Sequence, residues 1–428
     1  MLKTITVSLR MTVRTLKSST ICRPGSGSTR SCATRITISS TRIYLISNCS
    51  IQNPKRRGHS MAKRASKKKT VKKTKAGMAQ PQIFKGLAGV VADTTSISKV
   101  MPETNSLTYR GYAVQDLAAQ CSFEEVAYLI LQGELPTRSQ LNAFKKKERA
   151  LRKISKSHAD VIAKFPRRAH PMDTIQVAVA YLGTTEVAWG AEPLEADMER
   201  AMSLLAKIPT MIATDFRLRQ GKRRIAPRTD LSMAENFFNM CFGRIPPKTV
   251  IKAFDVSLIL YAEHSFNAST FTGRVITSTR SDIYSATTGA IGALKGPLHG
   301  GANEAVMEMM KKVGRPSNAE KWLRDAMANK DLVMGFGHRV YKQGDSRVPT
   351  MKACLEDLTE WSGDTKWLEI YNTMADIMVS EKGIHPNLDF PSGPAYYLMG
   401  FPINLYTPHF CHGPDNRLVG ALLRAKRE

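Results

Sequence analysis

The sequence predicts an all-α fold for the body of the chain, on three observations. Strand-like alternation is nearly absent after residue 112, and most segments beyond it carry apolar residues at helical spacing between capping signals. The chain has 428 residues, 42% apolar and 23% charged, which provides core for two domains or for one large domain with an inserted lobe. No apolar run approaches the roughly 20 residues that cross a bilayer, so we expect a soluble body without membrane association.

The first elements of this body are expected to be short strands and turns. Residues 83–118 alternate Val, Ile and Thr with polar residues and are interrupted by glycines. A helix should follow, because Ser122 is a good N-cap and Glu125, three residues later, completes a capping box. Gly133 and Pro136 mark its end.

The segments that follow are amphipathic in the way that helices require. Residues 137–154 place Leu141, Phe144 and Leu151 on one face, with basic residues opposite. The same pattern returns in residues 247–264, 317–329 and 364–381. No internal repeat is visible, so we expect a single helical assembly and not a repeat array.

Net charge is +27, which by itself favours a nucleic-acid or anionic-surface partner. Residues 1–92 contain no Asp or Glu and 20 Lys and Arg, so the other 336 residues carry only +7. Nucleic-acid binding is therefore expected only nonspecifically, through the tail. Three interpretations of the tail stay open: a start placed upstream of a true start at Met61, a targeting segment over residues 1–60, or an arm that binds polyanions. We expect a cytoplasmic protein, or a mitochondrial-matrix one if residues 1–60 are a transit peptide.

The seven cysteines indicate neither a disulfide framework nor a zinc site. Only Cys121, Cys241 and Cys354 lie in the central body, far apart and without a CxxC spacing. We therefore expect no metal site and a reducing compartment.

Two histidines are candidate functional residues. His264 follows an apolar helical face and precedes the small-residue segment NASTF, although a hydrogen-bonded core histidine is the commoner interpretation. His299 lies in GPLHGGANE, just before a helix expected from about Asn303 to Met309. The positive helix end favours a neutral imidazole that donates a hydrogen bond to a carbonyl. The alternative is a glycine-rich junction that only packs tightly.

The stretch MGFGHRVYKQGDSRVPTMK supplies three more candidates. Two glycines bracket a bend that presents His338, which is titratable and suited to general acid work. Arg347 offers the planar fork that clamps a carboxylate, and Lys342 offers a point charge suited to a phosphate. A solvated basic loop is the alternative.

Asp389, in PNLDFPSG, is the candidate base. A carboxylate between apolar neighbours can have its pKa raised toward usefulness as a base. Capping the helix that follows is the commoner role for an aspartate at such a position, and it stays open.

In this order and spacing, GPLHGGANE, GFGHRVY with a later arginine, and PNLDFPSG resemble the citrate synthase family. Residues from about Lys85 to Pro408 look like its bacterial 2-methylcitrate synthase branch, which is favoured by GLAGVVADTTSISKV, NSLTYRGYAVQDLAA, ILYAEHSFNASTF and SDIYSATTGAIGALKG. The resemblance implies a homodimer with a cleft between a large helical domain and a small inserted helical lobe. We assign the extension, the large domain, the lobe and the large-domain C-terminal part to residues 1–80, 81–301, 302–392 and 393–428.

The resemblance also implies roles for the candidates. Asp389 would remove a proton from the carbon beside the thioester carbonyl, and His299 would hydrogen-bond the enolate oxygen. His338 would polarise and protonate the ketone of oxaloacetate, while Arg347 and His264 hold that substrate. Lys342 stands where the family uses a basic residue near the CoA phosphates.

The reaction so implied condenses propionyl-CoA or acetyl-CoA with oxaloacetate, forming 2-methylcitrate or citrate and releasing CoA. No metal or redox cofactor is expected, because the CoA thioester is itself a substrate. Residues alone do not rank the two acyl groups, since one methylene is discriminated by about 1–3 kcal/mol.

The C-terminal residues depart from this family. After TPHF the family continues in a pattern like F-V-x-x-R-x-x-G-W-x-A-H-x-x-E-Q, whereas this chain reads CHGPDNRLVGALLRAKRE. Codons read from the second base of Phe410 allow S-V-M-A-R-T-T-G-W-W-A-H-Y-Y-E-Q, so we hypothesise a one-base frame displacement near Phe410. Cys411 and His412 then have no functional role. A catalytically impaired homologue, lacking an arginine that faces the substrate carboxylates, is the alternative function.

Overall fold

The computed structural model describes residues 91, 93–186, 194–338, 340–341, 343–409 and 411, together with three short strands before residue 46. The chain divides into two compact units, residues 1–88 and residues 89–428. The hypotheses about a disordered extension and a frame displacement fall on residues 1–80 and 410–428, most of which lie outside the described residues.

The described part of the first unit is a three-stranded antiparallel sheet in the order β1-β2-β3. Its strands are β1 (Ser19–Ile21), β2 (Ala33–Ile38) and β3 (Thr41–Leu45). In the register, Ser19 pairs with Arg35 and Thr34 pairs with Leu45.

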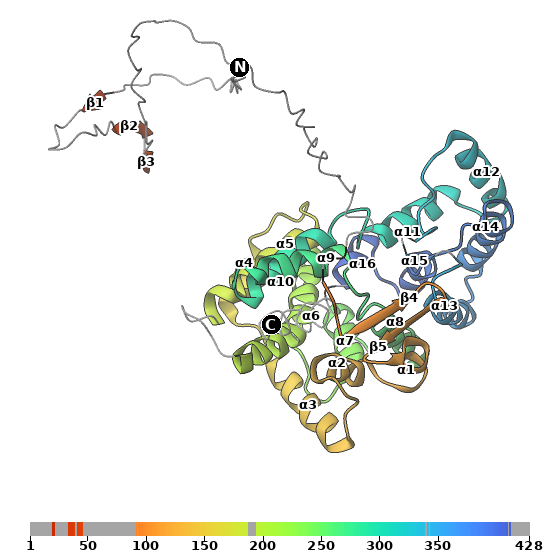
Figure 1. Ribbon diagram of the computed structural model, residues 1–428, viewed down its shortest axis with the longest axis horizontal. Coiled ribbons are helices and arrows are strands. Elements are labelled where there is room, and N and C mark those ends of the chain that lie inside the picture. Colours follow the sequence, from red (N-terminus) through yellow and green to blue (C-terminus); the bar gives the residue numbers. More distant parts are fainter. Residues whose placement is uncertain are drawn as a thin grey trace, which may run out of the picture. The chain divides into compact units, whose positions relative to one another are not determined.

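The second unit opens with short strands, as predicted. They form an antiparallel sheet of β4 (Ser98–Met101), β5 (Ser106–Tyr109) and β6 (Tyr112–Ala113). The remaining regular elements described in this unit are helical, which confirms the all-α prediction (Figure 1). They begin with α1 (Val114–Gln120), α2 (Phe123–Gln132), α3 (Arg138–Leu151), α4 (Lys156–Ala163), α5 (Pro171–Glu186), α6 (Leu194–Arg219), α7 (Met233–Phe242) and α8 (Lys248–Leu260).

The chain continues through a second run of helices that contains most of the candidate site. These are α9 (Ala268–Ser278), α10 (Ile283–Leu294), α11 (Ala302–Val313), α12 (Ala319–Asn329), α13 (Val348–Ser362), α14 (Lys366–Lys382), α15 (Asp389–Leu398) and α16 (Tyr406–His409), with 3-10 turns at Pro316–Asn318 and Ile403–Leu405. Among the described residues, no helix is both long and apolar enough to cross a membrane.

Local signals place several of these helices. The predicted capping box at the start of α2 is present, with the Ser122 amide and hydroxyl both 2.7 Å from Glu125 Oε2. Gly133 ends that helix with φ +101°, a conformation that glycine adopts without strain. Asp389 is the first residue of α15 and no side chain caps that helix at Leu388, so the capping interpretation of Asp389 is wrong.

Two groups of helices within the second unit show how its elements pack. In the first, α5 packs on α6 and α10, and α10 packs on α9 (Figure 1). In the second, α12 packs on α14, and α13 packs on α8 and α15. A cluster of aromatic rings fills the core between α7, α8 and the end of α15, with Phe401 4.9 Å from Phe238 and 4.2 Å from His409 between ring centroids.

Candidate active site

The predicted site residues come together around one cavity of about 360 Å³. It is lined by segments that follow α8, precede α11, precede α13 and begin α15. His264, His299, His338, Arg347 and Asp389 all line this cavity, although up to 125 residues separate them in the chain. Lys342, the sixth candidate, lies outside the described residues.

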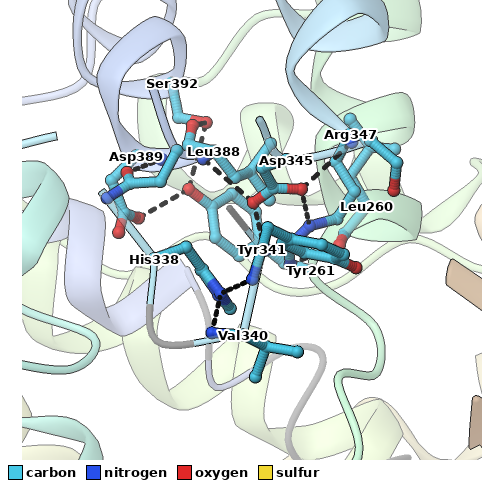
Figure 2. Close-up of polar contacts among 12 residues, drawn as sticks. Leu260, Tyr261, His338, Val340, Tyr341, Asp345, Arg347, Leu388, Asp389 and Ser392 are labelled. Carbon is cyan, nitrogen blue, oxygen red and sulfur yellow. Dashed lines mark hydrogen bonds and ion pairs between the residues drawn. The ribbon is translucent and has the colours of Figure 1, made fainter. Parts of the chain in front are cut away.

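Asp389 enters the cavity at the first turn of α15. Its carboxylate Oδ1 accepts a hydrogen bond from Tyr261 Oη at 2.8 Å (Figure 2). The same tyrosine oxygen lies 3.0 Å from Ser392 Oγ, one turn along α15. Burial and the negative charge of Asp389 raise the pKa of Tyr261 well above its ordinary value, so the hydroxyl keeps its proton.

His338 is held by the backbone that follows it. Its Nδ1 accepts hydrogen bonds from the amides of Val340 at 3.1 Å and Tyr341 at 3.3 Å (Figure 2). Because a backbone amide can only donate, Nδ1 carries no proton and Nε2 is the protonated nitrogen. This neutral tautomer can donate one hydrogen bond from Nε2.

His299 has the opposite tautomer. Its Nε2 accepts from the backbone amide of Ser269 at 3.2 Å, which leaves the proton on Nδ1. Ser269 Oγ also lies 3.0 Å from Nε2 and donates to Asn267 Oδ1 at 2.6 Å. Because α9 carries Ser269 and Asn267 caps that helix, α9 fixes the orientation of the imidazole.

Arg347 is buried and paired with Asp345. Its Nε and Nη2 contact the two carboxylate oxygens at 2.9 and 2.7 Å, and Nη1 lies 3.4 Å from the Leu260 carbonyl (Figure 2). Burial alone would raise the pKa of Asp345, but the charge and hydrogen bonds of Arg347 lower it from 3.8 to about 2. Asp345 Oδ2 also accepts from the Leu388 amide at 3.3 Å, which links the guanidinium to the segment bearing Asp389.

His264 packs edge to face on Tyr341 and lies tilted against His338. Its ring centroid lies 5.1 Å from that of His338 and 5.6 Å from that of Tyr341. The turn after it is fixed by Ser98 Oγ, which donates to Glu263 at 3.0 Å and accepts from the Ser265 amide at 2.9 Å. The strand that begins the body of the chain thus holds the segment containing His264.

The segment that precedes α13 in the sequence and the segment that follows α14 are joined by backbone hydrogen bonds at the cavity. The Asn387 amide donates to Gly335 O at 2.9 Å, and the Gly337 amide donates to His385 O at 2.9 Å. Asn387 Nδ2 also donates to Gly337 O at 3.0 Å. Gly335 has φ +85°, and a Cβ atom there would lie 2.7 Å from the Phe390 ring, so only glycine allows this close approach.

The sequence interpretation missed Tyr261, Ser269 and Asp345. Each forms a hydrogen bond with a candidate residue: Tyr261 with Asp389, Ser269 with His299 and Asp345 with Arg347. An acidic residue two positions before Arg347 was the one visible signal. The other two contacts join distant parts of the chain and leave no local pattern.

The chain is similar in sequence to known proteins. Residues 86–422 match the family model described as "Citrate synthase, C-terminal domain". The chain is 58% identical over 330 residues to a citrate synthase of Mycolicibacterium smegmatis, covering 77% of this chain and 88% of that one. It is 57% identical over 331 residues to a 2-methylcitrate synthase of Mycobacterium tuberculosis strain H37Rv, covering 77% and 84%.

Solved structures agree with these relatives. A citrate synthase of Thermoplasma acidophilum, in a ternary complex with carboxymethyl coenzyme A and oxaloacetate, is similar with a TM-score of 0.78 at 34% identity, covering 82% of this chain and 93% of that one. A citrate synthase of Pyrobaculum aerophilum is similar with a TM-score of 0.75 at 34% identity, covering 84% and 94%.

Proposed function

The chain belongs to the citrate synthase family, and from that premise we propose that its cavity joins an acyl-CoA to oxaloacetate. The protein is an acyl-CoA:oxaloacetate C-acyltransferase that forms 2-methylcitrate or citrate and releases CoA. One observation carries the assignment of this reaction to the cavity: a carboxylate, two histidines with opposite tautomers and a buried arginine line the same space. Relatives named citrate synthase and 2-methylcitrate synthase match at similar identity, so either propionyl-CoA or acetyl-CoA is the acyl donor.

The first step is proton removal from the carbon beside the thioester carbonyl. Asp389 takes this proton, and the electron pair moves into the carbonyl to form an enolate. His299 donates its Nδ1–H to the enolate oxygen. A neutral imidazole suits this role because it stabilises developing negative charge without transferring its proton to the enolate.

The second step forms the carbon–carbon bond to the ketone of oxaloacetate. His338 donates its Nε2–H to the ketone oxygen, which becomes the hydroxyl of the product. Arg347 and His264 hold the carboxylates of oxaloacetate. Water then hydrolyses the thioester: it returns a proton to Nε2 of His338, and Asp389 gives the proton that it took from the substrate to the departing CoA thiolate. The steps need proton transfer and hydrogen bonding from these side chains, so we propose that no metal or redox cofactor takes part.

We further propose that Lys342 contacts the CoA phosphates and that the active protein is a homodimer. Val177 on α5 and Val275 on α9 are 43% and 51% exposed, and we propose that the subunit contact buries them. The thiols of Cys121, Cys241 and Cys354 are unpaired, which supports a reducing compartment such as the cytoplasm.

Release of free thiol from propionyl-CoA and from acetyl-CoA, with oxaloacetate present, tests the function. We expect turnover by the full chain and its loss in Asp389→Asn, which removes the base and keeps the shape of the side chain. The ratio of kcat/KM values names the acyl donor. A folded chain without turnover on either thioester would support the impaired homologue, which the close relatives do not favour.

A further inference from the structure

Tyr261 places one hydroxyl between two acceptors. It lies at the C-terminal end of α8 and is buried, with its Oη 2.8 Å from Asp389 Oδ1 and 3.0 Å from Ser392 Oγ (Figure 2). Ser392 Oγ itself donates to the Leu388 carbonyl at 2.7 Å. The hydroxyl proton of Ser392 is therefore already used in a hydrogen bond, and its Oγ can accept from Tyr261 Oη.

A count of protons then gives Tyr261 two alternative states. An ionised Asp389 can only accept, and a charged acceptor forms the stronger hydrogen bond, so the tyrosine proton points to Asp389. A protonated Asp389 is a weaker acceptor, and Ser392 Oγ becomes the competing partner. Rotation of the O–H bond exchanges these states without displacing any heavy atom.

We propose that Tyr261 is a positioning residue whose hydroxyl proton turns from Asp389 to Ser392 when Asp389 takes the substrate proton. The inference rests on the proposed function, because it takes Asp389 to be the base. In the step itself the substrate C–H bond breaks, its proton goes to Asp389 and its electron pair enters the enolate. Tyr261 keeps its own proton throughout, which agrees with the raised pKa of this buried hydroxyl.

Two substitutions should therefore move the pKa of Asp389 in opposite directions. Tyr261→Phe removes a hydrogen bond that favours the charged carboxylate. The apparent pKa of the acid limb of the kcat/KM profile should therefore rise by about one pH unit. Ser392→Ala keeps the donor but removes the oxygen to which its proton turns when Asp389 is neutral, so the neutral carboxyl becomes less favourable. That acid limb should fall by about one pH unit, and kcat should also fall.

The other titratable groups around Asp389 are unchanged in both variants. His264, His299, His338 and Arg347 line the same cavity, and Tyr396 approaches from α15. Tyr396→Phe is the matched control, because it removes a buried hydroxyl of the same helix that is hydrogen-bonded to Ser257. It should lower the melting temperature and leave the acid limb in place.

The experiment measures pH profiles of thiol release for the full-length wild type, Tyr261→Phe, Ser392→Ala, Tyr396→Phe and Asp389→Asn. Opposite shifts in the first two variants, with none in Tyr396→Phe, support the inference. Shifts in one direction, or no shift, overturn it while the loss of activity in Asp389→Asn upholds the proposed function. Turnover that survives in Asp389→Asn overturns the proposed function instead. If Tyr261→Phe does not fold, the downward shift in Ser392→Ala decides alone.

Discussion

At the residue scale, backbone amides decide which ring nitrogen carries the proton in His299 and in His338. The Ser269 amide occupies Nε2 of His299, while the Val340 and Tyr341 amides occupy Nδ1 of His338. Each imidazole therefore keeps one N–H. Because amides do not titrate, this assignment of donors is independent of pH for as long as both rings stay neutral.

Arg347 should not tolerate replacement by lysine. An ammonium cannot reproduce the two contacts to Asp345, whose side chain is fully buried, so Arg347→Lys should lower the free energy of unfolding by about 2 kcal/mol. The KM for oxaloacetate should rise by about tenfold or more. Chemical denaturation and steady-state kinetics measure the two effects.

Arg324→Lys is the matched control. Arg324 pairs with Glu320 and Glu381, but its side chain is 48% exposed, so the substitution should leave the free energy of unfolding nearly unchanged. Equal decreases in the free energy of unfolding in the two variants would mean that the buried guanidinium of Arg347 does not stabilise the fold more than an exposed one.

The residue types of the site could be predicted from the sequence, but their partners could not. His299, His338 and Asp389 stand in glycine- or proline-bounded motifs, where a reactive side chain on a bend is a recognisable signal. Tyr261 directly follows the apolar residues that end α8, where an aromatic residue looks like core. Its contact with Asp389 spans 128 residues, so the fold and not the local pattern creates it.

At the scale of elements, α4 carries a buried histidine that should make the fold sensitive to acid. His158 packs edge to face on Tyr181, and burial and then the charge of Lys207 lower its pKa to about 4. The unfolded chain binds this proton near pH 6.5, so stability is fully present above that value and falls as pH drops toward 4. The loss should be about 3 kcal/mol.

His158→Phe tests this prediction, because phenylalanine fills the same space beside Tyr181 and does not titrate. The free energy of unfolding should decrease between pH 7 and pH 4.5 in both proteins. The decrease should be smaller in the variant than in the wild type. The same decrease in both proteins would assign the acid sensitivity to other groups.

The contact between the segments before α13 and α15 should depend on Gly335. A Cβ atom at this position would lie 2.7 Å from the Phe390 ring and 2.9 Å from Val306, in a backbone with φ +85°. Gly335→Ala should therefore cost about 3 kcal/mol, from backbone strain and overpacking together. Activity should fall as well, since the segment continues to His338.

Gly363→Ala separates the two causes. Gly363 ends α13 with φ +71° and has open space where a Cβ would lie, so its replacement should cost only about 1 kcal/mol. Thermal melts of both variants give the comparison, and similar losses would rule out a steric role for the Phe390 ring.

Element starts were more predictable than the way the elements pack. The capping box of α2 and the helix after His299 follow from signals within a few residues, and both are present. The antiparallel contact of residues 335–337 with residues 385–387 spans about 50 residues. Such contacts depend on the packing of the whole core, so no short sequence pattern predicts them.

At the scale of the whole molecule, several segments that are distant in the sequence together line the cavity. Residues that follow α8 supply Tyr261 and His264, the junction before α11 supplies His299, and segments on either side of α13 and α14 supply His338 and Asp389. A cavity assembled from distant segments depends on how the helices that carry these segments pack. We therefore expect substitutions that alter subunit association to lower activity, as substitutions of cavity residues do.

Subunit association should be disrupted by a charge at Val275, an exposed apolar residue of α9. Val275 is 51% exposed on the packed group of α5, α6, α9 and α10, so an interface there would bury it. Val275→Asp would then place an unpaired charge in an apolar contact and shift a dimer to monomers at micromolar concentration. Ile245→Asp is the control, because Ile245 is 42% exposed on the loop between α7 and α8. Light scattering should find monomers for Val275→Asp alone. A dimer that survives Val275→Asp would move the interface to another face.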